Sequence, residues 1–488
     1  MTTQDTNIAV AIAGLGQSNP RRVALLAGEK PTTFGALRYQ SICFALHLKK
    51  HGVTRNSCVA IDLPDVRNSF PVVLAVGFLG ARWVASTIYA YQNKALGITH
   101  VVHNGTTRYP AGPAVVRMDD TWQNLPVDQD VSAGINFPGY ASSDDAFAIF
   151  QSSGSTGTPK FIPVSYRQMH DRLSVSRKFI STSRPIVASM FNPLSSTGCR
   201  LRLSTLSAGG ALLETPRIEY WRKAGVTMVQ GSPAHFAKWF DQHNPPSGRK
   251  LPLARLGGGK AQPELISMLR KYFESIRVGF GSTETGTVSD RILLSEDTHD
   301  GRLGVIGDHA QVEIVDSQNS PLPTGQEGRV RVRTPGMVQA YLGNLEATSK
   351  AFREGWFYPG DIGVLSDQNE LVLLRRENDQ FSLGGAKLDA TTVDEIIQKE
   401  AGIRDAISCE VPDKVGVNRL GVVIQTSGTD VKREDLEIQI RRIMHKELGE
   451  SFLPTHLLFV PVAPRNENGK PMRHRAAEMI QESMGDKE

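Results

Sequence analysis

The sequence predicts an α/β protein with a large N-terminal domain of mixed and parallel sheets, a β-hairpin-rich subdomain and a small α+β C-terminal domain. The chain has 488 residues, which is too long for one ordinary hydrophobic core. Short apolar runs alternate with amphipathic stretches over residues 20–290, which is the pattern of an α/β architecture. From residue 311 onward, short segments that alternate with period two replace that pattern.

Five apolar segments organise the large domain. Residues 23–28 (VALLAG) and 59–64 (VAIDLP) have the short apolar pattern of strands. Residues 71–81 predict a buried helix that is too short to span a bilayer. The apolar runs 146–150 and 276–280 are expected to be strands, and each leads into a glycine-containing motif.

Two further signals describe the C-terminal part of the chain. Residues 312–316 and 329–333 alternate with period two and are joined by a turn-rich link, which predicts a β-hairpin. Residues 433–448 predict a helix in which four apolar side chains share one face: Leu436, Ile440, Ile443 and Leu448.

A charged, polar crossing at residues 375–379 separates these two signals and is typical of a hinge. We therefore predict a large domain at residues 1–375, a hinge at residues 376–378 and a small domain at residues 379–488.

Composition excludes several classes of protein. The hydrophobic content of 40% and the net charge of +5 are those of a globular protein, and no basic run with interleaved aromatics indicates nucleic-acid binding. The start of the chain lacks the basic region of a secretory signal. The four cysteines are far apart, which disfavours a zinc site or a disulfide framework: Cys43, Cys58, Cys199 and Cys409. We expect a cytoplasmic protein with no membrane span.

The strongest motif is a glycine- and hydroxyl-rich loop that follows the strand at residues 146–150. Glycines let backbone N–H groups approach an anion, hydroxyls add donors, and a terminal lysine adds a mobile positive charge. The spacing is not that of a Walker A motif, and the alternative interpretation is a flexible surface turn. The loop and its lysine are expected to bind ATP phosphates: Ser152, Ser153, Gly154, Ser155, Thr156, Gly157, Thr158 and Lys160.

At this loop the sequence resembles the acyl-adenylate-forming superfamily, which includes acyl- and aryl-CoA synthetases, nonribosomal-peptide adenylation domains and luciferase-type enzymes. Phe161 replaces the glycine that usually follows the lysine. The resemblance implies a standalone AMP-forming acid–thiol ligase that uses ATP and Mg²⁺.

Further motifs follow in the order of that superfamily. Gly258, Gly259 and Lys260 resemble the loop beside adenine. The segment Phe280, Gly281, Ser282, Thr283 and Glu284 resembles a motif whose aromatic ring stacks on adenine, whose threonine donates to phosphate and whose glutamate holds Mg²⁺. Thr156 is expected to be the second metal-binding residue.

Residues near the predicted hinge resemble the ribose and hinge motifs. Asp361 is the expected acceptor for both ribose hydroxyls, although Pro359 stands where threonine is usual. Arg376 resembles the nucleotide-contacting arginine, and Asn378 stands at the pivot, where Asp or Lys is usual. Two glycines of the small domain, Gly384 and Gly385, would line a tunnel for a thiol.

Lys470 ends a segment, residues 464–470, that resembles the C-terminal signature of the superfamily. The resemblance implies that Lys470 bridges the substrate carboxylate and the α-phosphate. It also implies a second pose, in which the small domain rotates and Lys470 leaves.

The substrate is less well defined by the sequence. Ser195 and Ser196 stand in the acyl-pocket motif where the superfamily often has Phe and His, and residues 190–198 contain no acid to pair with an α-ammonium group. A fatty or aromatic carboxylic acid is therefore expected. The acceptor is CoA or the phosphopantetheine of a separate acyl carrier protein.

Other function classes remain open. A luciferase-like oxygenase would share every motif, and a non-catalytic binding protein on the same fold is the other alternative. Nucleic-acid ligases and tRNA synthetases also adenylate, but neither K-x-D-G nor the H-I-G-H and K-M-S-K-S pair occurs.

Overall fold

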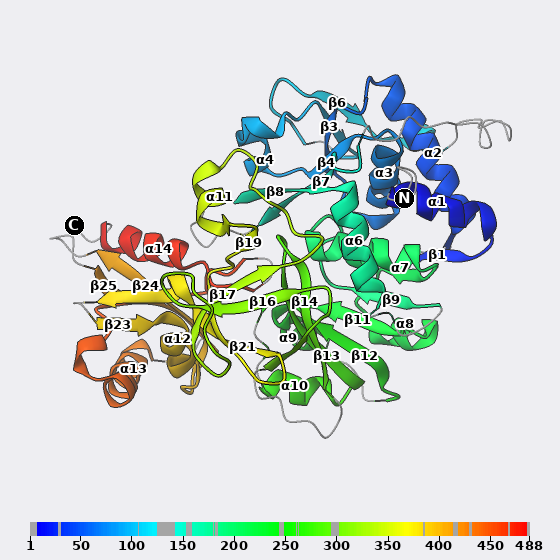
Figure 1. The fold of residues 1–488 in the computed structure, drawn as a ribbon. Helices are drawn as coiled ribbons and strands as arrows, with labels where there is room; N and C mark the ends of the chain where they lie inside the picture. The colour runs from blue at the N-terminus through cyan, green and yellow to red at the C-terminus, as the bar shows by residue number, and fades with distance from the viewer. Residues whose placement is uncertain are drawn as a thin grey trace.

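The computed structural model describes residues 7–27, 31–105, 107–123, 142–152, 159–178, 180, 184–243, 248–259, 261, 263–293, 302–383, 386–412, 418–428, 432–466 and 469–485. These residues form an α/β body with two large sheets and, in the C-terminal part of the chain, a small α+β domain (Figure 1).

A six-stranded sheet forms the first part of the body, in the order β6-β5-β3-β4-β7-β8. Its strands pair in parallel except for the antiparallel pair β7–β8. The strands are β3 (Cys58–Asp62), β4 (Arg82–Ala85), β5 (His100–His103), β6 (Ala114–Arg117), β7 (Ala146–Ser152) and β8 (Lys160–Ser165).

The larger sheet contains 15 strands within the described residues and combines two pairing modes. Strands β1, β10, β9, β11, β12 and β13 lie next to one another in parallel, and β14 to β21 continue the sheet in antiparallel pairs. Parallel neighbours end at the same edge, so the loops after these strands gather there. The bounds are β1 (Val23–Leu26), β2 (Thr32–Thr33), β9 (Ile186–Ser189), β10 (Ala211–Leu213), β11 (Met228–Gly231), β12 (Leu251–Leu256), β13 (Phe273–Ser282), β14 (Gly286–Leu293), β15 (Arg302–Ile306), β16 (Gln311–Val315), β17 (Gly328–Arg333), β18 (Phe352–Arg353), β19 (Trp356–Phe357), β20 (Asp361–Leu365) and β21 (Glu370–Arg376).

Helices cover both faces of the parallel strands, so most side chains of these strands are buried. Leu201 of α7 packs on one face, against side chains of β9, β11 and β12. Helices α8, α9 and α10 pack on the other face around Val229 and Ala254. The helices of the body are α1 (Ile8–Ser18), α2 (Phe34–Lys50), α3 (Val66–Phe78), α4 (Ile88–Gln92), α6 (Tyr166–Arg177), α7 (Ser196–Ser207), α8 (Ile218–Ala224), α9 (Pro233–His243), α10 (Pro263–Leu269) and α11 (Leu345–Ala351), with the 3-10 helices η1 (Lys94–Leu96) and η2 (Asp120–Gln123).

The small domain has its own hydrophobic core. A β-hairpin and a three-stranded sheet pack with α12 and α13 around side chains such as Val393, Val422 and Ile440. The elements are η3 (Glu377–Asp379), β22 (Gln380–Leu383), β23 (Ala386–Asp389), α12 (Ala390–Gln398), β24 (Ile403–Pro412), β25 (Asn418–Thr426), α13 (Arg433–Leu448), η4 (Glu450–Phe452), β26 (His456–Val460) and α14 (Arg473–Gly485).

The secondary structure predicted from the sequence is largely confirmed. The period-two segments form the antiparallel pair β16–β17, and the predicted helix 433–448 is α13, whose buried side chains include Leu436 and Ile440. The helix predicted at 71–81 was placed too late, because the Asp65 side chain caps the backbone N–H of Arg67 and starts α3 at Val66. The domain limits at 375 and 379 stay predictions, since β21 continues through Arg376 and η3 follows directly.

Candidate active site

The turn between β13 and β14 presents the Thr283–Glu284 pair at the edge where the parallel strands end. A buried arginine of α6, Arg172, holds this turn in place. Its Nη1 donates to the carbonyl of Thr283 at 2.9 Å, and its Nη2 donates to the carbonyl of Glu284 at 2.8 Å. Its Nε donates to the carbonyl of Gly336 at 2.8 Å. Burial lowers the pKa of Arg172 to about 10, against the opposing effect of the Glu284 carboxylate.

The Glu284 carboxylate is buried and hydrogen-bonded on one side only. Tyr341 donates its hydroxyl to Glu284 Oε1 at 2.9 Å, and burial together with that carboxylate raises the pKa of Tyr341. The Lys160 ammonium lies 4.8 Å from the centre of the Tyr341 ring. The motif lysine, the tyrosine and the motif glutamate therefore form one contiguous group.

Lys160 stands at the base of the predicted phosphate loop. It begins β8 and pairs directly with Ser152, the last residue of β7. The loop between them, with its predicted ligands Ser153, Gly154, Ser155, Thr156, Gly157 and Thr158, lies outside the described residues.

Asp361 and Arg376 face each other across the β20–β21 pair. Arg376 Nε lies 3.0 Å from Asp361 Oδ1, while Oδ2 is buried and has no hydrogen-bond partner. Arg376 Nη1 also donates to the carbonyl of Pro359 at 2.6 Å. Burial raises the pKa of Asp361, and the positive charges of Arg376 and Lys470 oppose that rise. Asp361 Oδ2 can therefore accept a hydrogen bond from a ligand, while Arg376 fixes the position of the carboxylate.

The loop that carries Lys470 is tied down inside the small domain. Arg465 forms two hydrogen bonds with the Asp405 carboxylate, at 2.6 and 2.8 Å, and donates to the carbonyl of Gly469 at 2.8 Å. The Asn466 side chain accepts from the backbone N–H of Lys470 at 2.9 Å. These contacts fix the direction in which the lysine leaves the loop.

The same loop meets α9 of the large domain. Gly469 has a φ of +78°, and a Cβ built on it would lie 2.1 Å from the Cβ of Ala234. Only glycine permits both this backbone conformation and this approach. The contact therefore brings the two domains together at the residue before Lys470.

Lys470 lies in the electrostatic field of groups from both domains. Burial between the domains lowers its pKa, Arg376 lowers it further, and the carboxylates of Asp361 and Glu284 act in the opposite direction. By solvent accessibility Lys470 is nevertheless an exposed residue, so it lies at the edge of the contact between the domains. The structure thus brings Lys470 into range of Asp361, Arg376 and Glu284, which lie more than 90 residues earlier in the chain.

The other predicted residues fall in three groups. Gly258, with a φ of +82°, and Gly259 follow β12, while Phe280 is half-buried in β13 ahead of Gly281 and Ser282. Asn378 lies in η3. Three predicted residues lie outside the described part of the chain: Lys260, Gly384 and Gly385.

The predicted acyl-pocket serines begin α7. The Ser195 hydroxyl accepts from the backbone N–H of Gly198 at 3.2 Å and donates to the carbonyl of Asn192 at 2.8 Å, so it caps the helix. Ser196 is the first helical residue.

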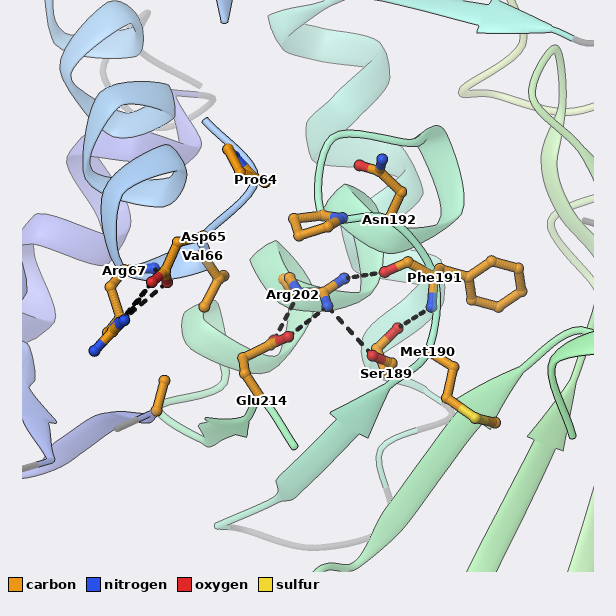
Figure 2. A pocket seen from close by; sticks show the side chains of 12 residues that line it. Pro64, Asp65, Val66, Arg67, Ser189, Met190, Phe191, Asn192, Arg202 and Glu214 are labelled. Atoms are coloured by element: carbon orange, nitrogen blue, oxygen red, sulfur yellow. Dashed lines mark hydrogen bonds and ion pairs between the residues drawn. The ribbon is translucent and has the colours of Figure 1, made fainter. Parts of the chain in front are cut away.

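An open hollow of about 420 Å³ lies beside this segment, at the ends of β1, β9 and β10 (Figure 2). On one wall, Arg202 pairs with Glu214 through two hydrogen bonds of 2.8 Å and donates to the carbonyl of Phe191 (Figure 2). The charges of Arg202 and Glu214 therefore neutralise each other.

A magnesium ion fits the residues present, on the chemistry of the donors. No cluster of three or more His, Cys, Asp or Glu side chains suited to a metal occurs among the described residues. Glu284 offers one oxygen that Tyr341 does not occupy. Magnesium in nucleotide sites is held by one or two carboxylates together with phosphates and water, so one carboxylate suffices.

Sequence reasoning missed two residues of the site, Arg172 and Tyr341. Neither belongs to a glycine-rich motif. A weak signal existed for Tyr341, because it precedes a Leu-Gly-Asn turn in which Asn344 caps α11. No local signal distinguishes Arg172 from a surface arginine of an amphipathic helix.

Comparisons with known proteins identify the family of the chain. The AMP-binding enzyme family matches residues 15–342. 4-Coumarate–CoA ligase 4 of Arabidopsis thaliana is 23% identical over 483 residues, which cover 88% of this chain and 83% of the relative. 2-Succinylbenzoate–CoA ligase of a Geobacillus strain is 24% identical over 487 residues, which cover 94% and 95%.

Solved structures show the same fold. The o-succinylbenzoate CoA synthetase of Bacillus subtilis with ATP and magnesium superposes with a TM-score of 0.82 at 19% identity, covering 96% of this chain and 98% of that one. A double mutant of that enzyme with the product analogue OSB-NCoA gives 0.69 at 18% identity, covering 96% and 97%. Among the described residues, no helix has the length and hydropathy needed to cross a membrane. By the extent of these matches, the chain belongs to the AMP-binding enzyme family and is an enzyme of its AMP-forming acid–CoA ligase branch.

Proposed function

We propose that the chain activates a carboxylic acid as its acyl-adenylate and then transfers the acyl group to the thiol of CoA. A carboxylate oxygen attacks the α-phosphorus of ATP, the bond from the α-phosphorus to the bridging oxygen of the β-phosphate breaks, and pyrophosphate leaves. A thiolate then attacks the acyl carbon, and the carbon–oxygen bond to AMP breaks. The observation that carries the proposal is the approach of Lys470 to Asp361 and Glu284 across the two domains.

Each charged side chain of the candidate site has a proposed role in formation of the acyl-adenylate. The partnerless oxygen of Asp361 accepts from the ribose hydroxyls, while Arg376 holds the carboxylate in position. Lys470 brings the two anions, carboxylate and α-phosphate, together and offsets the charge that develops between them. Lys160 restrains the terminal phosphates. A magnesium ion at Glu284, and at Thr156, would neutralise phosphate charge during transfer.

Arg172 and Tyr341 support this arrangement as positioning residues. Arg172 fixes the backbone of the Thr283–Glu284 turn, and Tyr341 fixes the Glu284 carboxylate. Both act through Glu284.

The second step requires another arrangement of the domains. In the proposed first step Lys470 lies at the reacting phosphate, and the approach of Gly469 to Ala234 of α9 supports a closed arrangement of the domains. Rotation about residues 376–378 would withdraw Lys470 and bring Gly384 and Gly385 to the thiol. Binding of the product analogue OSB-NCoA to the Bacillus subtilis enzyme supports CoA as the acceptor. The phosphopantetheine of a separate carrier protein uses the same thiol chemistry.

The acid is expected to be aliphatic or aromatic rather than an α-amino acid. Two acids line the hollow beyond β9 and β10, and both are already paired: Asp65 with Arg67, and Glu214 with Arg202. Neither is therefore available to an ammonium group. The relatives are named for different acids and do not select one.

The test is ATP–pyrophosphate exchange with a panel of fatty, aryl, dicarboxylic and amino acids, followed by detection of thioester with CoA or with a carrier protein. Acid-dependent exchange and a CoA thioester are expected. Nucleotide binding without exchange by any acid would support the non-catalytic alternative.

A further inference from the structure

A buried arginine, Arg200 of α7, has no carboxylate partner among the described residues. It is 9% exposed, and its Nη1 donates to the hydroxyl of Ser176 on α6. The groups that act on it electrostatically are two more arginines, Arg255 and Arg172. Burial and these like charges lower its pKa to about 9. A buried guanidinium without an anion is costly, so a charge of the opposite sign is expected from outside the chain.

Two donor atoms of Arg200 have no hydrogen-bond partner among the described residues and are not sealed from solvent. Its Nε and Nη2 make no hydrogen bond, yet neither is among the side-chain atoms sealed from solvent without a partner. Both atoms therefore keep some solvent-accessible surface, although the residue as a whole is buried.

The face of the sheet that packs against α7 carries a row of polar side chains. Gln230, Arg255 and Arg277 are direct neighbours on β11, β12 and β13. Leu253, two residues before Arg255, packs against Leu201 of α7, so the row faces α7. The amide oxygen of Gln230 is buried without a partner.

The acidic groups of this region serve other arginines. Asp290 Oδ2 lies 3.0 Å from Arg277 Nη1 and also acts on Arg255. The Glu284 carboxylate acts on Arg172. Neither carboxylate is among the groups that act on Arg200.

The region adjoins the site of acid activation. Arg172 and Ser176 lie one turn apart on α6, about 6 Å along the helix axis. Arg172 reaches the carbonyls of Thr283 and Glu284, and Ser176 holds Arg200. At the end of β12, two residues beyond Arg255, a Cβ added at Gly257 would meet no atom within 4 Å. The open space at Gly257 therefore lies close to Arg255 in the polar row.

We propose that the acid carries a second carboxylate, which binds Arg200 at the floor of the acyl site, with Arg255 and Gln230 beside it. This inference rests on the proposed acid activation. It narrows the aliphatic or aromatic acids to those with a distal anionic group and disfavours plain fatty acids. A guanidinium presents paired donors that match a carboxylate, which gives such a site its selectivity.

The test compares diacids with their monoesters, which keep the length and shape but lose the distal charge. Succinic, glutaric, adipic and phthalic acids and their monomethyl esters are assayed by ATP–pyrophosphate exchange. At least one diacid is expected to exceed its monoester by about 100-fold in kcat/KM, the size of a lost hydrogen-bonded charge contact. Arg200→Met should remove that preference, and Arg200→Lys should restore part of it.

A matched control lies on the same helix pair. Arg177 of α6 donates to the Ser207 hydroxyl of α7 at 3.1 Å, but at the surface, so Arg177→Met should keep the diacid preference. Thermal unfolding supplies a second readout. Because Arg200 is buried without an anion, Arg200→Met should not lower the ligand-free Tm, and a diacid should raise the Tm of the wild type only.

The outcomes separate the inference from the function. Exchange with monocarboxylic acids alone, or a diacid preference that survives Arg200→Met, would overturn the inference and leave acid activation standing. Exchange with no acid at all would contradict the proposed function and the inference together.

Discussion

Arg376 holds one oxygen of Asp361 at 3.0 Å and leaves the other oxygen buried without a partner. A buried carboxylate oxygen that accepts nothing is destabilising, so the residue is arranged for a ligand and not for the stability of the free protein. The rise in the pKa of Asp361 on burial has the same origin.

Asp361→Asn should therefore weaken nucleotide binding. Asparagine keeps one acceptor but loses the charge that Arg376 matches, and we expect AMP affinity to fall by about 10- to 100-fold. Isothermal titration with AMP measures the change. Glu370→Gln is the matched control, because Glu370 pairs with Arg302 at the opposite end of β21 from Arg376. Equal AMP affinity in the wild type and Asp361→Asn would contradict the ribose role.

Tyr341→Phe should raise the Mg²⁺ concentration needed for adenylation. The phenylalanine ring keeps the packing against Lys160 but no longer donates to Glu284, which loses its fixed orientation. A loss of about 10-fold in exchange rate at limiting Mg²⁺ is expected from one hydrogen bond to a charged group. Tyr109→Phe removes a similar bond, to Asp62 at 2.6 Å, outside the site and should leave the Mg²⁺ dependence unchanged. Identical Mg²⁺ curves for Tyr341→Phe and the wild type would count against Glu284 as a metal-binding residue.

Gly469→Ala should block domain closure. The new Cβ would meet Ala234 at 2.1 Å, and the positive φ adds strain. Adenylation is expected to fall by at least about 10-fold, whereas thiol transfer from a supplied acyl-adenylate should persist. Gly449→Ala carries the strain alone, since Gly449 has a φ of +89° and no atom within 4 Å of the added Cβ. If both variants lose the same activity, the contact with α9 has no role in closure.

The small domain should show a pH-dependent stability that originates at Asp394. Burial raises the pKa of Asp394 from 3.8 to about 6, against the opposing effect of Arg473. A raised folded-state pKa means that the folded protein binds the proton more tightly. The corresponding stability is present below pH 3.8 and is lost as the pH rises through about 6.

Thermal unfolding between pH 4 and 7 measures this effect. The Tm of the wild type should decline over that window relative to Asp394→Asn, whose amide does not titrate. Parallel Tm curves for the two proteins would show that Asp394 does not titrate in this range.

Much of the fold and part of the candidate site can be predicted from local sequence motifs. Thr283, Glu284 and Asp361 belong to short contiguous motifs, in which the backbone shape and the chemical group are encoded together. Arg172 acts on Glu284 from 112 residues away, and Tyr341 acts from 57 residues away. Such contacts arise only from tertiary packing and leave no periodic or glycine-rich signal.

The proposed acyl site is a second case in which tertiary contacts leave no signal in the sequence. Ser195 and Ser196 are predicted to line the acyl site because they occupy a motif position. The unpaired charge of Arg200 became visible only when the folded structure placed it beside Arg255 and without an acid. In the sequence an arginine four residues into a helix is indistinguishable from an exposed one.

The central claim is that Lys470 acts in acid activation and not in thiol transfer. The direct test is Lys470→Ala, with Lys446→Ala as a control on an exposed lysine of the same domain. Both half-reactions are measured separately: ATP–pyrophosphate exchange, and thioester formation from a synthetic acyl-adenylate. Lys470→Ala should reduce exchange by at least about 100-fold and keep thioester formation near the wild-type rate. Unimpaired exchange, or equal loss of both half-reactions, would contradict the account.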